Sequence, residues 1–113
     1  MRYLIMEKRY EIKFYIGIGF DANGNPVGDV DRKLNAATSK LTAAFQGVTR
    51  YNHTGYWAEN AATSVVAESG VTFVTVVDSD ALAEVTVVAN YLRDLFNQNC
   101  VLVTRSVIEA EFI

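Results

Sequence analysis

The sequence is short of the side chains that build disulfide frameworks and zinc sites. Among its 113 residues there is one cysteine and one histidine. A disulfide within the chain needs two cysteines, and a zinc site built from several Cys or His ligands needs more of them than this chain has. Both are excluded, and the sequence predicts no metal site.

Concentrated positive charge is also lacking. Lys and Arg total 10 and Asp and Glu total 13, which gives a formal net charge of −3. Because nucleic-acid binding draws on concentrated positive charge, we expect no nucleic-acid partner.

Long apolar runs are absent as well. No stretch approaches the roughly 18 continuous apolar residues of a membrane span. The apolar patch at residues 3–6 is followed at once by charged residues, so it lacks the core of a secretion signal. We therefore expect a cytoplasmic protein with no membrane partner.

What the sequence does contain is typical of one compact domain. Half of the residues are apolar and 20% are charged. We predict a single domain over 1–113, with residues 1–9 as a candidate flexible N-terminal extension. A domain of this length has little room for a deep private cleft, so a site shared between subunits is expected.

The apolar periodicity predicts four strands and two helices. Alternation with a period of two indicates a half-buried strand, and stripes of helical spacing indicate two helices. Asp29 is placed to cap the first helix and Gly47 to end it. The predicted elements are a strand over 10–20, a helix over 30–46, strands over 48–59 and 65–77, a helix over 82–96 and a strand over 100–113. This order predicts an α+β, ferredoxin-like βαββαβ fold, in which two helices cover one face of an antiparallel sheet.

Two glycine positions interrupt the strand patterns. Ser69 and Gly70 predict a bulge or a bend in the third strand. The run Gly17-Ile18-Gly19-Phe20 is similar to half of a phosphate loop, but no helix follows at once and no Lys-Ser/Thr pair follows. We therefore expect no phosphate site there.

The single histidine and the single cysteine have ordinary explanations. No Asp or nucleophile is spaced around His53 to suggest a catalytic triad, so a polar strand position is the expected role. Cys100 leads an apolar strand, where a small core residue is typical.

Glu68 is the carboxylate that most needs an explanation. It follows Val65-Val66-Ala67, and a carboxylate among apolar neighbours is costly unless it is paired with a cation, solvated or protonated. Two interpretations stay open: a binding role beside Tyr56 and Trp57, or a turn at Ser69 that points Glu68 into solvent.

Glu109 and Glu111 share one parity of the last strand. Charged side chains at such positions keep an edge strand soluble, which explains both residues.

Two segments carry a resemblance to a known family. The first is Thr54-Gly55-Tyr56-Trp57-Ala58-Glu59, followed by a strand rich in β-branched residues. The second, after a helix, is Asn97-Gln98-Asn99-Cys100-Val101-Leu102-Val103-Thr104-Arg105-Ser106. In this order and separation, over residues 48–106, they resemble the phage-encoded S-adenosylmethionine (SAM) lyases, long called SAM hydrolases.

The resemblance implies a ferredoxin-like homotrimer that binds SAM between subunits. Carried over by position, Tyr56 and Glu68 are the catalytic residues, and Trp57 and Glu109 are substrate-binding. The family destroys SAM and so protects an invading phage genome from host defences, which implies an anti-restriction role in the host cytoplasm.

The implied reaction needs no cofactor. The α-carboxylate of SAM attacks its own γ-carbon, which yields homoserine lactone and 5′-methylthioadenosine. Two alternatives stay open: direct hydrolysis of SAM by water, and a non-catalytic PII-like trimer that binds a ligand or inhibits a host enzyme.

Overall fold

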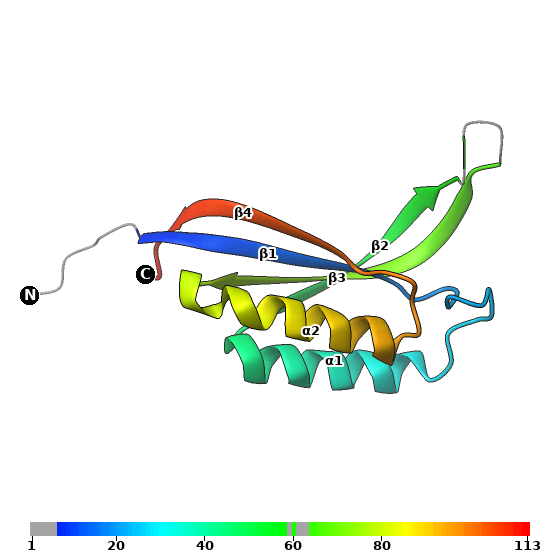
Figure 1. The fold of residues 1–113 in the computed structure, drawn as a ribbon, viewed down its shortest axis with the longest axis horizontal. Coiled ribbons are helices and arrows are strands. Elements are labelled where there is room, and N and C mark those ends of the chain that lie inside the picture. Colours follow the sequence, from blue (N-terminus) through cyan, green and yellow to red (C-terminus); the bar gives the residue numbers. More distant parts are fainter. Residues whose placement is uncertain (1–6, 59, 61–63) are drawn as a thin grey trace, which may run out of the picture.

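The chain folds into one antiparallel sheet covered on one face by two helices. The computed structural model describes residues 7–58, 60 and 64–113. The elements are β1 (Glu7–Gly17), α1 (Val30–Phe45), β2 (Thr49–Trp57), β3 (Val66–Val77), the short 3-10 helix η1 (Ser79–Ala81), α2 (Leu82–Leu95) and β4 (Leu102–Ala110). The strand order is β2-β3-β1-β4, and the two helices lie side by side beneath the sheet (Figure 1). The predicted ferredoxin-like α+β fold is confirmed.

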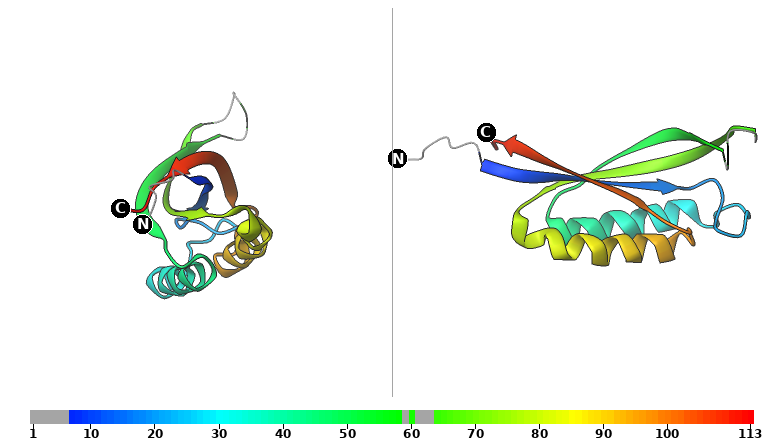
Figure 2. Two further views of the ribbon diagram at one scale, coloured as in Figure 1. Left: turned by 90° about the vertical axis from the view of Figure 1, so that its left-hand side faces the viewer. Right: turned by 45° about the horizontal axis from the view of Figure 1, so that its top comes forward.

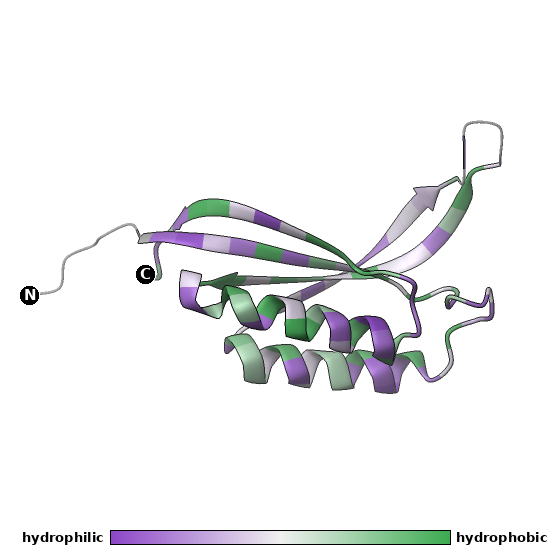
Figure 3. Cartoon of the chain, in the orientation of Figure 1, coloured by the Kyte–Doolittle hydropathy of each residue, from purple (hydrophilic) through white to green (hydrophobic). Residues whose placement is uncertain are grey.

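The core lies between the sheet and the helices. Ile12, Phe14 and Ile16 alternate along β1 and are each at most 1% exposed. Their neighbours in sequence point to the opposite, helix-free face, because successive side chains of a strand alternate. Both helices contribute an apolar stripe to this core and leave polar residues outside (Figure 3). None of the helices described is long and apolar enough to cross a membrane.

The hairpin of β2 and β3 reaches beyond the helices. In two views the far end of this hairpin projects past the helices (Figures 1 and 2). We call this end, residues 55–57 of β2 and 66–68 of β3, the arm. The β2–β3 ladder is continuous from Thr49↔Val74 to Trp57↔Val66. Residues of this arm therefore have no helix against either face.

The bounds of α1 agree with the sequence prediction to within one residue, but its capping differs. Asp29 precedes the helix, but its backbone is left-handed (φ 50°) and its side chain makes no capping hydrogen bond. At the other end Gln46, not Gly47, takes the left-handed conformation, with a φ of 70°. Its N–H donates to the carbonyl oxygen of Thr42 at 2.7 Å, which satisfies one of the free carbonyls of the last turn.

Other local predictions also need correction. Ser69 and Gly70 lie in the unbroken β2–β3 ladder, opposite Thr54 and His53, so there is no bulge. Cys100 is exposed rather than part of the core, because it precedes β4 in the connection from α2. Residues 7–9 of the predicted extension belong to β1, and residues 1–6 lie outside the described part of the chain.

Two buried threonines on β3 allow a matched test of this packing. Thr75 Oγ1 donates to the carbonyl oxygen of Gly47 at 2.7 Å. Thr72 is fully buried on the helix-free face, and its Oγ1 has no partner among the described residues. We expect Thr75→Val to lower the free energy of unfolding by about 1 kcal/mol and Thr72→Val to leave it unchanged or raise it, as urea unfolding at one protein concentration would show. Equal losses in both variants would contradict this hydrogen-bond assignment.

Candidate functional site

Glu68 lies on the helix-free face of the sheet, where the arm begins. On β3 the buried Val71 and Phe73 face the helices, so Glu68 and Gly70 face the other way. Directly opposite Glu68 on β2 is Gly55. On the other side of β3, the side chain of Glu68 lies towards the end of β1, against Gly17.

Two glycines form the floor on which this carboxylate rests. A Cβ atom at Gly17 would be 2.5 Å from Glu68 Oε1, and one at Gly19 would be 3.2 Å from Glu68 Cγ. Only glycine permits so close an approach of the carboxylate to the backbone. The backbone N–H of Phe20 donates to Glu68 Oε1 at 3.2 Å. We call residues Gly17–Phe20 the glycine cradle.

Gln98, just after α2, ties both ends of the glycine cradle. Its Nε2 donates to the carbonyl oxygens of Gly17 at 3.0 Å and Phe20 at 2.8 Å. Within the cradle, the N–H of Ile18 donates to the carbonyl oxygen of Ser69 at 2.9 Å. The segment is thus fixed on one side to the connection that follows α2 and on the other to β3 beside Glu68.

Among the described residues, the Glu68 carboxylate has no ion-pair partner. The ion pairs of the described residues join other groups, and Glu68 takes part in none of them. Its Oε2 also accepts no hydrogen bond from the described part of the chain. A partly buried anion held in one place without a cation is the arrangement expected of a binding site for a cationic group. Of the two interpretations open in the sequence, the binding role stays a prediction, and the structure places the half-buried Glu68 against Gly17 and Gly19 rather than turned out into solvent.

His53 lies beside Glu68 on the same face. Its ring covers Gly70, where a Cβ would be 2.3 Å from the ring atom Cε1. The ring also makes an edge contact with Tyr15, with centroids 6.1 Å apart. Its Nε2 is buried and has no hydrogen-bond partner among the residues that the structure describes. His53 is therefore packed more closely than an ordinary polar strand position requires.

The two aromatic candidates on β2 point in opposite directions. Trp57 shares the face of Glu68, whereas Tyr56 lies opposite Ala67 on the other face. Tyr56 is 72% exposed and Trp57 49% exposed. Within one chain, Trp57 therefore lies on the same face of the hairpin as Glu68, whereas Tyr56 lies on the opposite face.

Glu109 lies at the far end of the sheet. It pairs with Lys8 on β1, nine positions before Gly17. At about 3.3 Å per residue this is roughly 30 Å from the glycine cradle. Within one chain Glu109 and Glu68 do not share a site.

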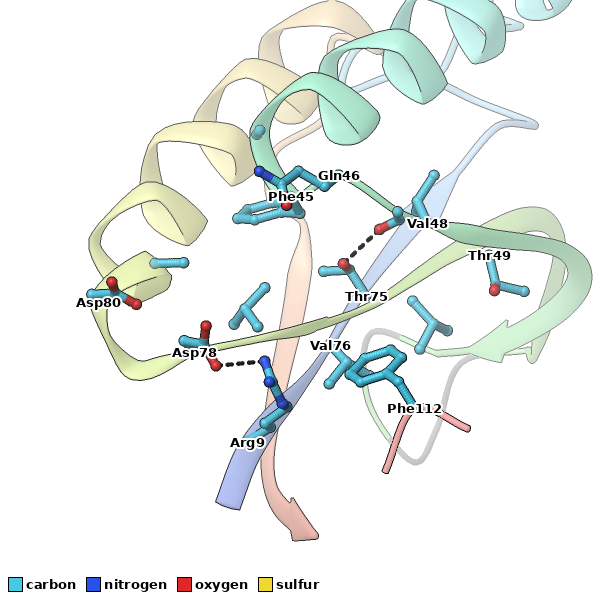
Figure 4. Close-up of a pocket in the computed structure, with 15 residues that line it drawn as sticks. Arg9, Phe45, Gln46, Val48, Thr49, Thr75, Val76, Asp78, Asp80 and Phe112 are labelled. Atoms are coloured by element: carbon cyan, nitrogen blue, oxygen red, sulfur yellow. Dashed lines mark hydrogen bonds and ion pairs between the residues drawn. The ribbon is translucent and has the colours of Figure 1, made fainter. Parts of the chain in front are cut away.

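A cavity lies at that far end as well. It has a volume of about 660 Å³ and lies between the end of α1, the start of α2 and the end of β3 (Figure 4). Arg9 pairs there with Asp78, and Phe112 packs over the Arg9 guanidinium at 5.3 Å. None of the four predicted site residues lines this cavity. Nor does the described part of the chain contain a group of three or more His, Cys, Asp or Glu residues that could hold a metal ion.

The sequence analysis missed the glycine cradle and Gln98 as parts of the site. The Gly-x-Gly spacing was visible, but it was interpreted only as an incomplete phosphate loop. The carboxylate of Glu68 occupies that space and takes the Phe20 N–H, so an anion is excluded from it.

Comparisons with known proteins identify the fold. No protein-family model matches the sequence, and no curated protein matches it. A solved structure of a phage SAM lyase in complex with S-methyl-5′-thioadenosine is similar, with a TM-score of 0.66 and 15% identity over 98% of this chain and 89% of that chain. CPII, a nitrogen regulatory PII-like protein from Thiomonas intermedia bound to ADP, AMP and bicarbonate, gives a TM-score of 0.61 and 9% identity, covering 94% of this chain and 96% of that one. The periplasmic divalent cation tolerance protein CutA from Archaeoglobus fulgidus gives 0.59 and 10%, covering 92% and 86%. At these identities the likeness shows a shared fold.

Proposed function

We propose that this protein is a SAM lyase that releases 5′-methylthioadenosine and L-homoserine lactone. The observation that carries the proposal is the Glu68 carboxylate, which is held on the glycine cradle without a basic partner among the described residues. SAM is a cation that carries an ammonium and a sulfonium, so it can supply the missing positive charge. The similar fold of a phage SAM lyase and the resemblance of residues 48–106 support the same assignment.

Glu68 binds the α-ammonium of SAM. Phe20 N–H occupies Oε1, which leaves Oε2 for the substrate. With the ammonium fixed, the α-carboxylate is free to turn towards the γ-carbon. Intramolecular reactions gain strongly when the reacting atoms are aligned in this way.

The reaction balances within the substrate itself. A carboxylate oxygen forms a bond to the γ-carbon while the bond from that carbon to sulfur breaks. The bonding electrons pass to sulfur, which leaves as the neutral thioether of 5′-methylthioadenosine. Because the positive and negative charges cancel as the new bond forms, a site drier than water favours the transition state over the separated charges.

The substrate lies between subunits of a homotrimer. Tyr56 and Glu68 are on opposite faces of the arm, so one chain does not bring them together. A neighbouring chain supplies the Tyr56 that orients the amino-acid end of SAM held by Glu68. Trp57 lies on the Glu68 side of the same arm and contacts the substrate, and Glu109 approaches a site only from a neighbouring chain. The enzyme acts in the cytoplasm of a phage-infected cell, where loss of SAM disables defences that depend on it.

Product analysis in ¹⁸O-labelled water tests the reaction. We expect purified protein and SAM to give methylthioadenosine and homoserine lactone, followed by homoserine. Lactone opening places ¹⁸O in the carboxyl group, whereas direct attack of water on the γ-carbon places it in the γ-hydroxyl group. Fragmentation in the mass spectrometer separates the two positions. Label in the γ-hydroxyl group would identify a hydrolase, and no methylthioadenosine at all would overturn the proposal.

A second candidate function is a non-catalytic, PII-like binding trimer. The 660 Å³ cavity at Arg9 and Asp78 favours it, because this cavity is remote from Glu68 and belongs to no step of the lyase reaction. The fold is also similar to that of the PII-like protein bound to ADP and AMP. Calorimetric binding of an adenine nucleotide without turnover of SAM, abolished by Arg9→Ala and not by Glu68→Gln, would establish this alternative.

A further inference from the structure

We propose that Gly17, Gly19 and Gln98 are positioning residues that hold the Glu68 carboxylate in its productive place. This inference rests on the proposed function, because it assigns to the glycine cradle the task of aiming the group that binds SAM. None of the three residues touches the substrate. They act through Glu68.

Gly17 leaves the space that the Glu68 carboxylate occupies. This residue is in the ladder, paired with Gly70 on β3, so its backbone has little freedom to move. A Cβ at this position would lie 2.5 Å from Glu68 Oε1 and 3.0 Å from Glu68 Cδ. The atoms in conflict are the end of a flexible side chain, so the carboxylate moves and the strand stays. Restoring an ordinary contact requires a displacement of about 1 Å.

At the far end of the cradle, a hydrogen bond from Phe20 positions the carboxylate. Phe20 N–H fixes Glu68 Oε1, so the place of that N–H decides where the carboxylate rests. Phe20 follows β1 and lies outside its ladder, where it forms a single isolated β-bridge with Pro26. Gln98 fixes this segment further by donating to the carbonyl oxygens of Gly17 and Phe20, at opposite ends of the cradle. A change at Gln98, which follows α2, therefore reaches Glu68 through Phe20.

The packing of the cradle also explains why glycine occurs twice. Gly19 faces Glu68 Cγ, where a Cβ would be 3.2 Å away, and Gly17 faces the carboxylate. Neither residue has a positive φ, so a left-handed backbone is not the reason for glycine here. The reason is the close approach of one side chain. Alanine is thus compatible with the backbone at both positions and tests the carboxylate specifically.

The experiment compares Gly17→Ala with Gly28→Ala. A Cβ at Gly28 would meet nothing within 4 Å, and its φ is also not positive, so it is a matched control. We expect Gly17→Ala to lower kcat/KM for SAM by about 10- to 100-fold, because a misplacement of about 1 Å has effects of this size. Gly28→Ala keeps wild-type kinetics, and both variants keep the wild-type unfolding midpoint.

A second readout does not depend on activity. The amide resonance of Phe20 reports its hydrogen bond to Glu68 and can be followed by NMR in any variant. We expect it to shift in Gly17→Ala and not in Gly28→Ala. In Gln98→Met, which keeps the side-chain length but removes the donor, we expect faster hydrogen exchange at Phe20 together with a reduced kcat.

The outcomes separate this inference from the proposed function. Wild-type kinetics and an unshifted Phe20 amide in Gly17→Ala would overturn the positioning role, even if Glu68→Gln is inactive. Full turnover in Glu68→Gln, or no SAM turnover by the wild-type protein, would overturn the proposed function. In that case the Phe20 amide still tests whether the cradle holds the carboxylate.

Discussion

Replacing Glu68 by glutamine is expected to lower kcat/KM for SAM by about 100- to 1,000-fold. Glutamine has nearly the same shape, and its amide oxygen can still accept the Phe20 N–H. What it loses is the negative charge that receives the α-ammonium. Removing one partner of a buried charge pair costs about 2–5 kcal/mol. A loss of 100- to 1,000-fold corresponds to about 3–4 kcal/mol, the middle of that range. Steady-state kinetics with methylthioadenosine as the measured product would show the loss.

The split between kcat and KM carries further information. If Glu68 only bound the substrate, KM would rise and kcat would stay unchanged. We expect kcat to fall as well, because an amino-acid end without its anchor samples many conformations in which the carboxylate misses the γ-carbon. The matched control is Glu84→Gln on the exposed side of α2, which removes the same charge away from the site. Equal losses in the two variants would show a general effect of charge and remove Glu68 from the mechanism.

The fold could be predicted because its main signals are local. Alternating apolar residues along β1 and the stripe of α1 each follow from a few neighbouring side chains. The order of the elements then leaves few topologies. The bounds of α1 were predicted to within one residue, but its capping was not, because Asp29 and Gln46 take left-handed conformations that no local pattern shows.

The glycines were harder to interpret because the contacts that require glycine at these positions come from residues far away in the sequence. Ser69 and Gly70 were expected to mark a bulge or a bend; there is no bulge, and Gly70 makes room for the His53 ring from the neighbouring strand. Gly17 likewise makes room for Glu68, which is 51 positions away in the chain. A sequence shows where a side chain is missing, but not which other side chain takes up the space.

The two catalytic candidates illustrate the same limit. Tyr56 and Glu68 flank the turn of one hairpin, and their closeness in sequence suggested a common site. Whether they share a face depends on the β2–β3 register, which a shift of one residue reverses. The register pairs Gly55, not Tyr56, with Glu68, and so places the two side chains on opposite faces. Within one chain the proposed site of Tyr56 and Glu68 is therefore incomplete.

Mixing two inactive variants is therefore expected to restore activity. Glu68→Gln retains Tyr56, and Tyr56→Ala retains Glu68. If each site takes Tyr56 from one subunit and Glu68 from its neighbour, a mixed ring contains some sites in which both side chains are intact. With random assembly from equal amounts, about a quarter of the sites are complete. We expect about that fraction of wild-type turnover after the two proteins are unfolded and refolded together.

The folded chains tolerate both changes, which keeps the experiment interpretable. Tyr56 is 72% exposed on the arm, and Glu68 makes no ion pair with the residues that the structure describes, so neither side chain supports the core. Each variant refolded alone serves as the control and keeps only its own residual activity. Turnover of the mixture equal to the average of the two controls would contradict a site shared between subunits. Because Tyr56 and Glu68 lie on opposite faces of one arm, that result would also remove Tyr56 from the reaction and leave Glu68 with partners from its own face, where Trp57 and His53 are the nearest candidates.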